Sequence, residues 1–157
     1  MAHPWYLNMS LKIVKKHFSK LTNQEVYDML DIRLEVFVTE QHIIYTDTDY
    51  RDQYSDHYLL YNGNQVVSYL RLIHPGHKYN EYSIGRVATR EKDRKKGYAT
   101  KLLLEAMNDI KGNAIRISAQ HYLKEYYEKF GFHAVGEPYI EEGILHVEML
   151  CLNRSID

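Results

Sequence analysis

The amino-acid sequence predicts an α/β domain, or α+β by a stricter label, with a mixed central sheet flanked by helices. Three observations lead to this prediction. The chain has 157 residues, a length typical of one domain with its own core. Strand patterns joined by a tight turn dominate its first half. Strand and helix patterns alternate in its second half, so we expect a single domain over residues 1–157.

The chain opens with a strand, a helix and a long loop. Apolar and polar residues alternate over residues 11–18, which predicts a strand. Thr22 and Glu25 have the spacing of a capping box, and apolar residues then recur at helical spacing, which predicts a helix over residues 23–38. The segment 40–56 is rich in Tyr and Asp without a clean period and predicts a shaped loop.

A hairpin follows this loop. Two strand patterns, residues 57–61 and 65–73, flank the dipeptide Asn62-Gly63, which tolerates the positive φ of tight turns. A further strand is predicted over residues 82–89, after a Pro-Gly break. We therefore expect three neighbouring strands in one sheet.

The second half alternates helix and strand. Apolar residues share one face over residues 97–110, and Gly112 follows as a stop signal, which predicts a helix. The remaining predicted elements are strands over residues 114–118, 132–136 and 144–152 and a helix over residues 121–130.

Composition and charge exclude several classes of protein. Lys and Arg number 20 against 21 Asp and Glu, and the 15 tyrosines are scattered, so no nucleic-acid partner is predicted. Cys151 is the only cysteine, which excludes an intrachain disulfide and favours a cytoplasmic location. No apolar stretch is long enough to span a membrane, so we expect no membrane partner.

The turn before the helix at residues 97–110 carries the most chemical information. It reads Arg94-Lys-Lys-Gly97-Tyr-Ala99, and the N-terminus of a helix offers unpaired N–H groups and a positive dipole end to an anion. It is neither a Walker A loop nor a dinucleotide fingerprint. Taken alone, the pattern fits an ordinary helix start equally well.

With the strand before it, the helix, the next strand and the run YYEKFGF, this turn closely resembles the acetyl-CoA-binding core of the GNAT N-acetyltransferases, over residues 82–136. The resemblance implies the GNAT fold and acetyl-CoA as co-substrate. It also implies that the turn binds the CoA pyrophosphate, and that the preceding strand pairs with the pantetheine arm and donates an N–H to the thioester oxygen. The implied CoA-binding residues are Val87, Ala88, Thr89, Arg94, Lys95, Lys96, Gly97, Tyr98, Ala99 and Thr100.

In the aligned register the resemblance assigns Tyr127 as the acid that protonates the departing thiolate. A phenol has a pKa near 10, close to that of an alkyl thiol, so the proton transfer is nearly balanced. Tyr126 stands where the family usually has Phe, and only one of the two neighbours can face the thioester. A core aromatic on an amphipathic helix is the alternative interpretation of Tyr127.

A narrower resemblance, to the ElaA-like branch of the GNAT family, covers nearly the whole chain. The stretches that carry it are RLEVFVTEQ, YTDTDYRDQYSDHYLL, YLRLIHPG, SIGRVATR and ISAQHYLKEYYEKFGFHAVGEPYIEEGILHVEM. They occur in the same order as in that branch.

The resemblance places the loop after the first helix at the acceptor pocket. Its acidic residues, with Glu40, Asp49 and His57 as candidate substrate contacts, would favour a cationic amine, although a solvated polar loop is the competing interpretation. A base must take a proton from the amine, and Glu81 and His146 are the first candidates, with Glu40 and His57 as further ones. No metal site is expected, because the histidines lack ligand spacing and one cysteine cannot form a zinc thiolate site.

The sequence thus predicts an N-acetyltransferase that moves the acetyl group of acetyl-CoA to a primary amine by direct attack in a ternary complex. The alternative is a GNAT-fold module that binds acetyl-CoA without turnover and regulates a partner. The acceptor, a small molecule or a peptide, stays open among polyamines, amino sugars, aminoglycosides and protein amines. Edge strands late in such folds lead us to expect a homodimer.

Overall fold

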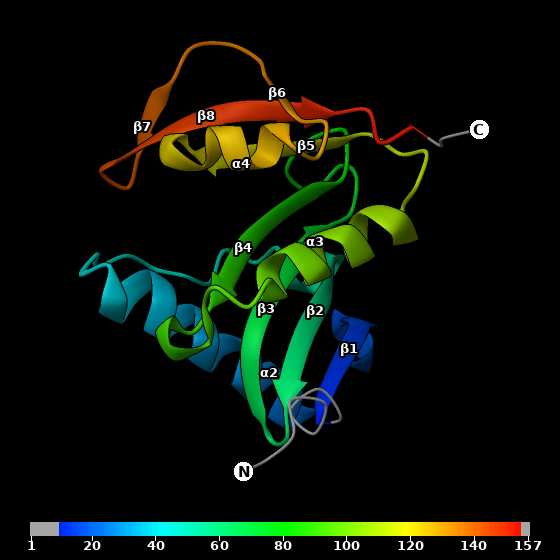
Figure 1. Cartoon of the computed structure of the whole chain (residues 1–157), viewed down its shortest axis with the longest axis vertical. Coiled ribbons are helices and arrows are strands. Elements are labelled where there is room, and N and C mark those ends of the chain that lie inside the picture. Colours follow the sequence, from blue (N-terminus) through cyan, green and yellow to red (C-terminus); the bar gives the residue numbers. More distant parts are fainter. Residues whose placement is uncertain (1–9, 155–157) are drawn as a thin grey trace.

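The computed structural model describes residues 10–154, which form two sheets with helices packed on them (Figure 1). In the first sheet the strands lie in the order β1-β2-β3-β4, and each neighbouring pair is antiparallel. In the second sheet β8 lies between β5 and β6 and also pairs with β7. The strands of the first sheet are β1 (Leu11–His17), β2 (Ser55–Asn62), β3 (Gln65–Ile73) and β4 (Ser83–Thr89). Those of the second are β5 (Ile115–Gln120), β6 (His133–Ala134), β7 (Tyr139–Glu141) and β8 (Ile144–Cys151).

The first helix starts where the sequence predicts and changes from α-helical to π-helical turns before it ends. Thr22 caps α2 (Asn23–Arg33), and Glu25 accepts a hydrogen bond from the Thr22 N–H, so the predicted capping box is present. A π-helical segment, η2 (Leu34–Glu40), continues α2 past the predicted end. Such wide turns are rare and often lie at functional sites. The long loop predicted next begins directly after η2.

The first sheet has a helix on each face. The β2–β3 hairpin forms as predicted, with Asn62 paired to Gln65 across the turn. Successive side chains of a strand point to opposite faces, and Leu60 packs with residues of α3 (Tyr98–Asp109) while Leu59 packs with residues of α2. The two helices therefore cover opposite faces of this sheet (Figure 1).

The second half of the chain differs from its prediction in detail. A 3-10 turn, η5 (His121–Leu123), and the short helix α4 (Lys124–Glu128) replace the single predicted helix. β7 lies between the last two predicted strands, where no strand was predicted. Its residues are all exposed and lack the apolar alternation by which a strand is recognised in a sequence. The other 3-10 turns are η1 (Phe18–Lys20), η3 (Asp52–Tyr54) and η4 (Glu91–Asp93). None of the helices in the described part of the chain is long and apolar enough to cross a membrane.

The two sheets meet at one point and then separate. Tyr82 forms a single parallel bridge with Ile115, and the Arg116 N–H donates to the Tyr82 carbonyl at 2.9 Å. Beyond this bridge, β4 and β5 form no ladder within residues 10–154. The α+β fold with mixed strand directions is confirmed, but the single central sheet of the prediction is divided between β4 and β5.

Candidate active site

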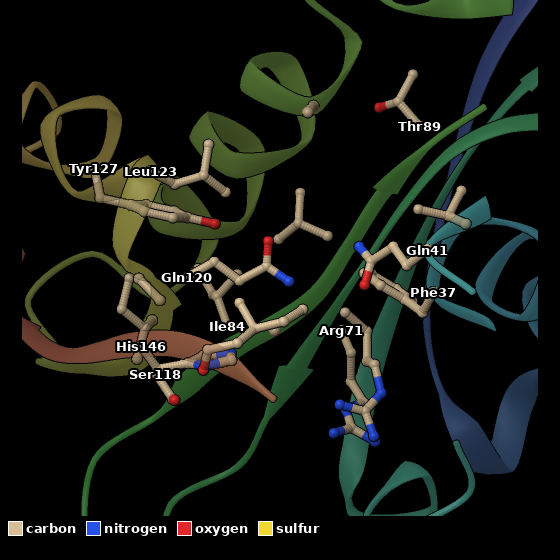
Figure 2. A pocket seen from close by; sticks show the side chains of 18 of the residues that line it. Phe37, Gln41, Arg71, Ile84, Thr89, Ser118, Gln120, Leu123, Tyr127 and His146 are labelled. Carbon is tan, nitrogen blue, oxygen red and sulfur yellow. The ribbon is translucent and has the colours of Figure 1, made fainter. Parts of the chain in front are cut away.

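The separation of β4 from β5 opens a cavity of about 840 Å³. Its lining comes from both strands, the N-terminal turn of α3, η2 and the loop after it, and the turn between β7 and β8. Figure 2 shows Tyr127 and His146 on one side of the cavity and Phe37 and Arg71 on the other. The volume is in the range of small-molecule and cofactor sites, so this cavity is the candidate active site.

An irregularity in β4 faces the cavity. Tyr69 of β3 pairs with Ala88 and Arg71 pairs with Gly85, so two residues of β4, Arg86 and Val87, lie opposite one of β3. Arg86 also has a positive φ of 50°, which is uncommon for a residue with a side chain. A bulge of this kind takes backbone groups out of the regular ladder. Arg86 and Val87 both line the cavity, where such groups can serve a ligand.

The turn before α3 has the backbone geometry expected of the predicted anion cradle. Lys95 and Gly97 have positive φ values of 64° and 77°, and alternating left-handed residues turn successive N–H groups in a common direction. The hydrogen bond from the Lys101 N–H to the Gly97 carbonyl at 3.0 Å begins the helix. The N–H groups before Lys101 therefore lack intrahelical acceptors, and this positive end of α3 borders the cavity.

Most of the predicted CoA-binding residues line the cavity, and two do not. Ala88 is buried in the cluster that packs on α2, and the Lys96 ammonium lies 3.6 Å from the Asp93 carboxylate. The side chains of Ala88 and Lys96 are thus directed away from the cavity, and the prediction for both, which concerns their backbone groups, stays a prediction. The predicted residues that do line the cavity are Val87, Thr89, Arg94, Lys95, Gly97, Tyr98, Ala99 and Thr100.

The two adjacent tyrosines of α4 have different roles. The Tyr126 hydroxyl forms a hydrogen bond with the Thr100 hydroxyl at 2.6 Å. The Tyr127 ring is buried among aromatic neighbours, and its hydroxyl points into the cavity (Figure 2). Burial raises the pKa of Tyr127, so its hydroxyl stays protonated well above neutral pH. Of the two tyrosines, Tyr127 is the one whose hydroxyl is directed into the cavity without a hydrogen-bond partner in the described part of the chain, so it stays the predicted acid.

His146 lies on β8 with one ring nitrogen available. It is buried, lines the cavity and pairs across the sheet with Gln120. Its Nδ1 is 2.7 Å from the Ile144 carbonyl oxygen, which only accepts, so Nδ1 carries the proton when the ring is neutral. Nε2 then has a free lone pair, 3.6 Å from the Glu141 carboxylate. This geometry suits a base.

Glu81, the other predicted base, lies outside the cavity. Its carboxylate accepts two hydrogen bonds from Arg116, at 3.1 and 3.0 Å, and borders a smaller separate pocket. The hydrogen bonds from Arg116 lower the pKa of Glu81. The structure does not bring Glu81 together with Tyr127 and His146, so we remove it from the candidate bases.

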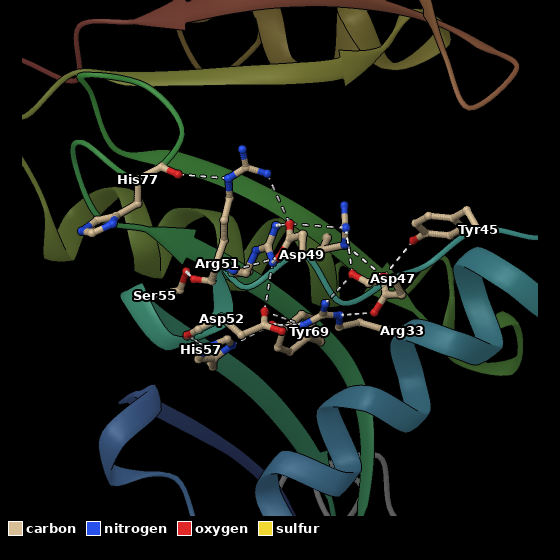
Figure 3. Close-up of polar contacts among 12 residues, drawn as sticks. Arg33, Tyr45, Asp47, Asp49, Arg51, Asp52, Ser55, His57, Tyr69 and His77 are labelled. Atoms are coloured by element: carbon tan, nitrogen blue, oxygen red, sulfur yellow. Dashed lines mark hydrogen bonds and ion pairs between the residues drawn. The ribbon is translucent and has the colours of Figure 1, made fainter.

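The acidic loop predicted to attract a cationic amine forms ion pairs within the protein instead (Figure 3). Glu40 and Asp49 line the cavity as predicted, but Glu40 accepts a 2.6 Å hydrogen bond from Arg94. Burial alone would raise the pKa of Asp49, but two hydrogen bonds from Arg71 outweigh it and hold the pKa well below its usual range. We call the set Arg33, Asp47, Asp49, Asp52, Arg71 and Arg86 the buried ion network.

His57, the third predicted substrate contact, is fully buried behind this network and does not line the cavity. Its Nε2 is 2.9 Å from the Asp52 carbonyl oxygen, so Nε2–H donates there and Nδ1 accepts from the Tyr69 hydroxyl at 2.7 Å. Desolvation lowers the pKa of His57 from 6.5 to about 4. The prediction that His57 contacts the acceptor, or acts on it as a base, is therefore corrected.

This buried histidine makes stability depend on pH. The folded-state pKa lies below the unfolded one, so the stabilising effect is complete above pH 6.5 and is lost as the pH falls towards 4. We expect the unfolding free energy to fall by about 3 kcal/mol from this group between pH 7 and pH 4. Urea unfolding of wild type, His57→Gln and the exposed control His133→Gln measures it. The same pH slope in wild type and His57→Gln would refute the assignment.

One group of side chains in the described residues has the spacing of a metal site. His17, Asp56 and His74 offer ligand atoms within 4.8 Å of one another, and His74 Nε2 is 2.9 Å from the Asp56 carboxylate. His17 Nδ1 accepts a hydrogen bond from the Ser19 N–H, which leaves the proton on Nε2. None of the three lines the cavity, so the candidate active site is built without them.

Sequence reasoning did not single out several residues that line the cavity. Gln120 and Ser118 lie on β5 and line the cavity, and Arg71 lies on the opposite wall (Figure 2). Arg86 also lines the cavity, where it forms an ion pair with Asp47. A charged residue within the apolar run Tyr69-Leu-Arg-Leu-Ile73 was the available signal for Arg71, because an arginine in a buried strand needs a carboxylate partner.

Comparison with known proteins agrees with this architecture. A family model described as an acetyltransferase (GNAT) domain matches residues 19–152. A UPF0039 protein of Synechocystis sp. is 36% identical over 140 residues, which cover 86% of this chain and 91% of that protein. Protein ElaA of Escherichia coli is 31% identical over 139 residues, which cover 85% of this chain and 91% of ElaA.

Solved structures extend the comparison to three dimensions. The crystal structure of an acyl-CoA N-acyltransferase from Pseudomonas aeruginosa matches with a TM-score of 0.87 and 34% identity, over 90% of this chain and 99% of that one. The crystal structure of Escherichia coli ElaA matches with a TM-score of 0.83 and 28% identity, over 90% and 99% of the two chains.

Proposed function

The chain belongs to the GNAT acetyltransferase family, in its ElaA-like branch, and from this premise we propose that it moves the acetyl group of acetyl-CoA to a primary amine. Transfer occurs by direct attack with both substrates bound. One observation carries the proposal: a single cavity joins the N-terminus of α3, the hydroxyl of Tyr127 and the free nitrogen of His146.

The cavity fits acetyl-CoA in two respects. The pyrophosphate has a cradle of unpaired N–H groups at the positive end of α3, which Arg94 and Lys95 border. The pantetheine arm carries amides, and the diverging edges of β4 and β5 leave backbone groups for an extended chain to pair with. Acetyl-CoA would supply the acetyl group as a thioester beside the bulge at Val87.

The chain's own residues perform three tasks in this proposal. His146 Nε2 accepts a proton from the amine, directly or through water. Backbone N–H groups at the bulge of β4 stabilise the negative charge that develops on the thioester oxygen. Tyr127, kept protonated by burial, gives its proton to the departing sulfur. Holding the two substrates in one cavity supplies much of the remaining acceleration.

Thermal unfolding with and without acetyl-CoA tests whether α3 binds the co-substrate. At about 100 times its dissociation constant, acetyl-CoA should stabilise the wild type by about 2.7 kcal/mol, which raises Tm by several degrees. In Gly97→Trp the indole would occupy the cradle, because a Cβ at Gly97 meets open space beside the cavity. We expect the increase in Tm to vanish in that variant.

The matched control is Gly112→Trp. Gly112 lies beyond the other end of α3, has a positive φ of 91° and also leaves open space for a Cβ, so both variants carry the same kind of backbone strain. Gly112→Trp should keep the full increase in Tm. An unchanged wild-type Tm in saturating acetyl-CoA, or an increase that survives in Gly97→Trp, would contradict the assignment of this cradle.

A further inference from the structure

The loop after η2 presents little of its negative charge to the cavity. The Asp47 and Asp52 side chains are 1% and 8% exposed, and both accept hydrogen bonds or ion pairs from Arg33, at 2.8 and 2.7 Å. Asp49 is 19% exposed and is held by Arg71 through both carboxylate oxygens. An acceptor amine in the cavity would find these carboxylates already paired.

Arg86 is the most exposed member of the same network, and Arg51 adds a second exposed guanidinium beside it. The Arg86 side chain is 24% exposed and lines the cavity, while its partner Asp47 is almost wholly buried. Arg86 uses Nε and Nη2 towards Asp47, and its Nη2 also lies 3.6 Å from the Asp49 carboxylate, while its Nη1 donates no hydrogen bond within residues 10–154. Arg51 is 41% exposed, lines the cavity and approaches Asp49 only to 3.7 Å.

A further cation lies among these groups. Lys78 lines the cavity and forms no ion pair within 4.0 Å in the described part of the chain. Desolvation lowers the pKa of Lys78, and Glu141 is the carboxylate that counteracts this effect. Repulsion from three guanidinium groups lowers the pKa of Lys78 further; they belong to Arg51, Arg71 and Arg86.

Carboxylates line the cavity at the turn between β7 and β8. Glu141 and Glu142 line the cavity there, and the Glu141 carboxylate is 3.6 Å from His146 Nε2. The cavity therefore has carboxylates beside the candidate base and accessible guanidinium groups on the wall of β4 and the preceding loop. Such an arrangement is complementary to a ligand with charges of both signs.

We propose that the acceptor carries an anionic group, a carboxylate or a phosphate, together with its amine, and that Arg86 binds this group with support from Arg51 and Lys78. The inference rests on the proposed acetyl transfer and narrows its substrate. Guanidinium groups pair with carboxylate and phosphate oxygens through two parallel hydrogen bonds. Polyamines and aminoglycosides, which carry only positive charges, are disfavoured by the same groups.

Matched pairs of amines test this inference by CoA-thiol release at saturating acetyl-CoA. Amino acids and dipeptides are compared with their carboxamides, and phosphoethanolamine with ethanolamine, so that each pair differs in one anionic group. Spermidine and an aminoglycoside represent polycations. We expect the anionic member of at least one pair to have a kcat/KM about 10-fold or more above its neutral partner. The pair that responds distinguishes carboxylate from phosphate.

Substitutions of Arg86 test whether this residue causes the higher kcat/KM for anionic amines. Arg86→Gln should lower kcat/KM for the anionic amine about 10-fold more than for its neutral partner. Arg86→Lys should restore part of this difference. Arg116→Gln is the control, because Arg116 is also 24% exposed in ion pairs but lies outside the cavity. Arg51→Gln provides a second variant if Arg86→Gln unfolds.

The possible outcomes separate the two proposals. Equal or faster transfer to neutral amines or polycations would overturn the anionic acceptor and leave acetyl transfer standing. An equal loss for both members of a pair in Arg86→Gln would also overturn it. Acetyl-CoA binding without transfer to any amine of the panel would overturn both proposals.

Discussion

Tyr127→Phe should lower kcat for acetyl transfer by about 100-fold or more, with little change in acetyl-CoA affinity. The variant keeps the buried ring and removes the hydroxyl that faces the cavity. General acid catalysis contributes about 100- to 10,000-fold to such steps, here by neutralising the charge that develops on the departing sulfur. Steady-state kinetics of CoA release, with binding measured by calorimetry, gives both quantities.

The neighbouring tyrosine provides the control for this prediction. Tyr126→Phe removes a hydroxyl on the same short helix, but one that is bonded to Thr100 at the start of α3. Its effect on kcat should therefore be small, with any loss appearing in the affinity for acetyl-CoA. A large loss of kcat in Tyr126→Phe with a nearly normal Tyr127→Phe would reverse the assignment.

Arg33→Met should destabilise the protein by about 3–5 kcal/mol, which lowers Tm by about 10 °C or more for a chain of this size. The Arg33 side chain is fully buried, and its removal leaves Asp47 and Asp52 with one guanidinium fewer in a desolvated site. Removing one partner of a buried ion pair costs far more than the pair contributes, because the other charge stays buried. Thermal and urea unfolding measure the loss.

An exposed ion pair provides the reference against which the destabilisation by Arg33→Met is compared. Lys15 bonds Glu105 at 3.0 Å, but its side chain is 45% exposed, so Lys15→Met should cost less than about 1 kcal/mol. Comparable losses for Lys15→Met and Arg33→Met would contradict the structural role given to the buried ion network.

Local signals in the sequence predicted several elements of the fold, including the turn that borders the cavity. The capping box at Thr22 and Glu25 starts α2, and Gly97 takes a left-handed conformation before α3, as a turn into a helix N-terminus requires. These features depend on residues a few positions apart, which the sequence displays directly. The β2–β3 hairpin at Asn62 belongs to the same class.

Features that depend on distant residues could not be predicted in this way. Asp47 meets Arg33 and Arg86, which are 14 and 39 residues away, and no periodicity indicates which carboxylate meets which guanidinium. The loop therefore looked acidic although its charges are paired. Glu81 had the right chemistry for a base, but Arg116, 35 residues away, holds it outside the cavity. The separation of β4 and β5 likewise leaves no local pattern.

Mass spectrometry of amine acetylation with isotope-labelled acetyl-CoA tests the central claim most directly. The amine panel is incubated with wild-type protein and with Tyr127→Phe, and labelled N-acetyl product is compared with the CoA released. We expect labelled product in equal amount to CoA with the wild type and about 100-fold slower formation with the variant. Acetyl-CoA binding without labelled product from any amine would contradict this claim, and would favour a module that binds acetyl-CoA without turnover.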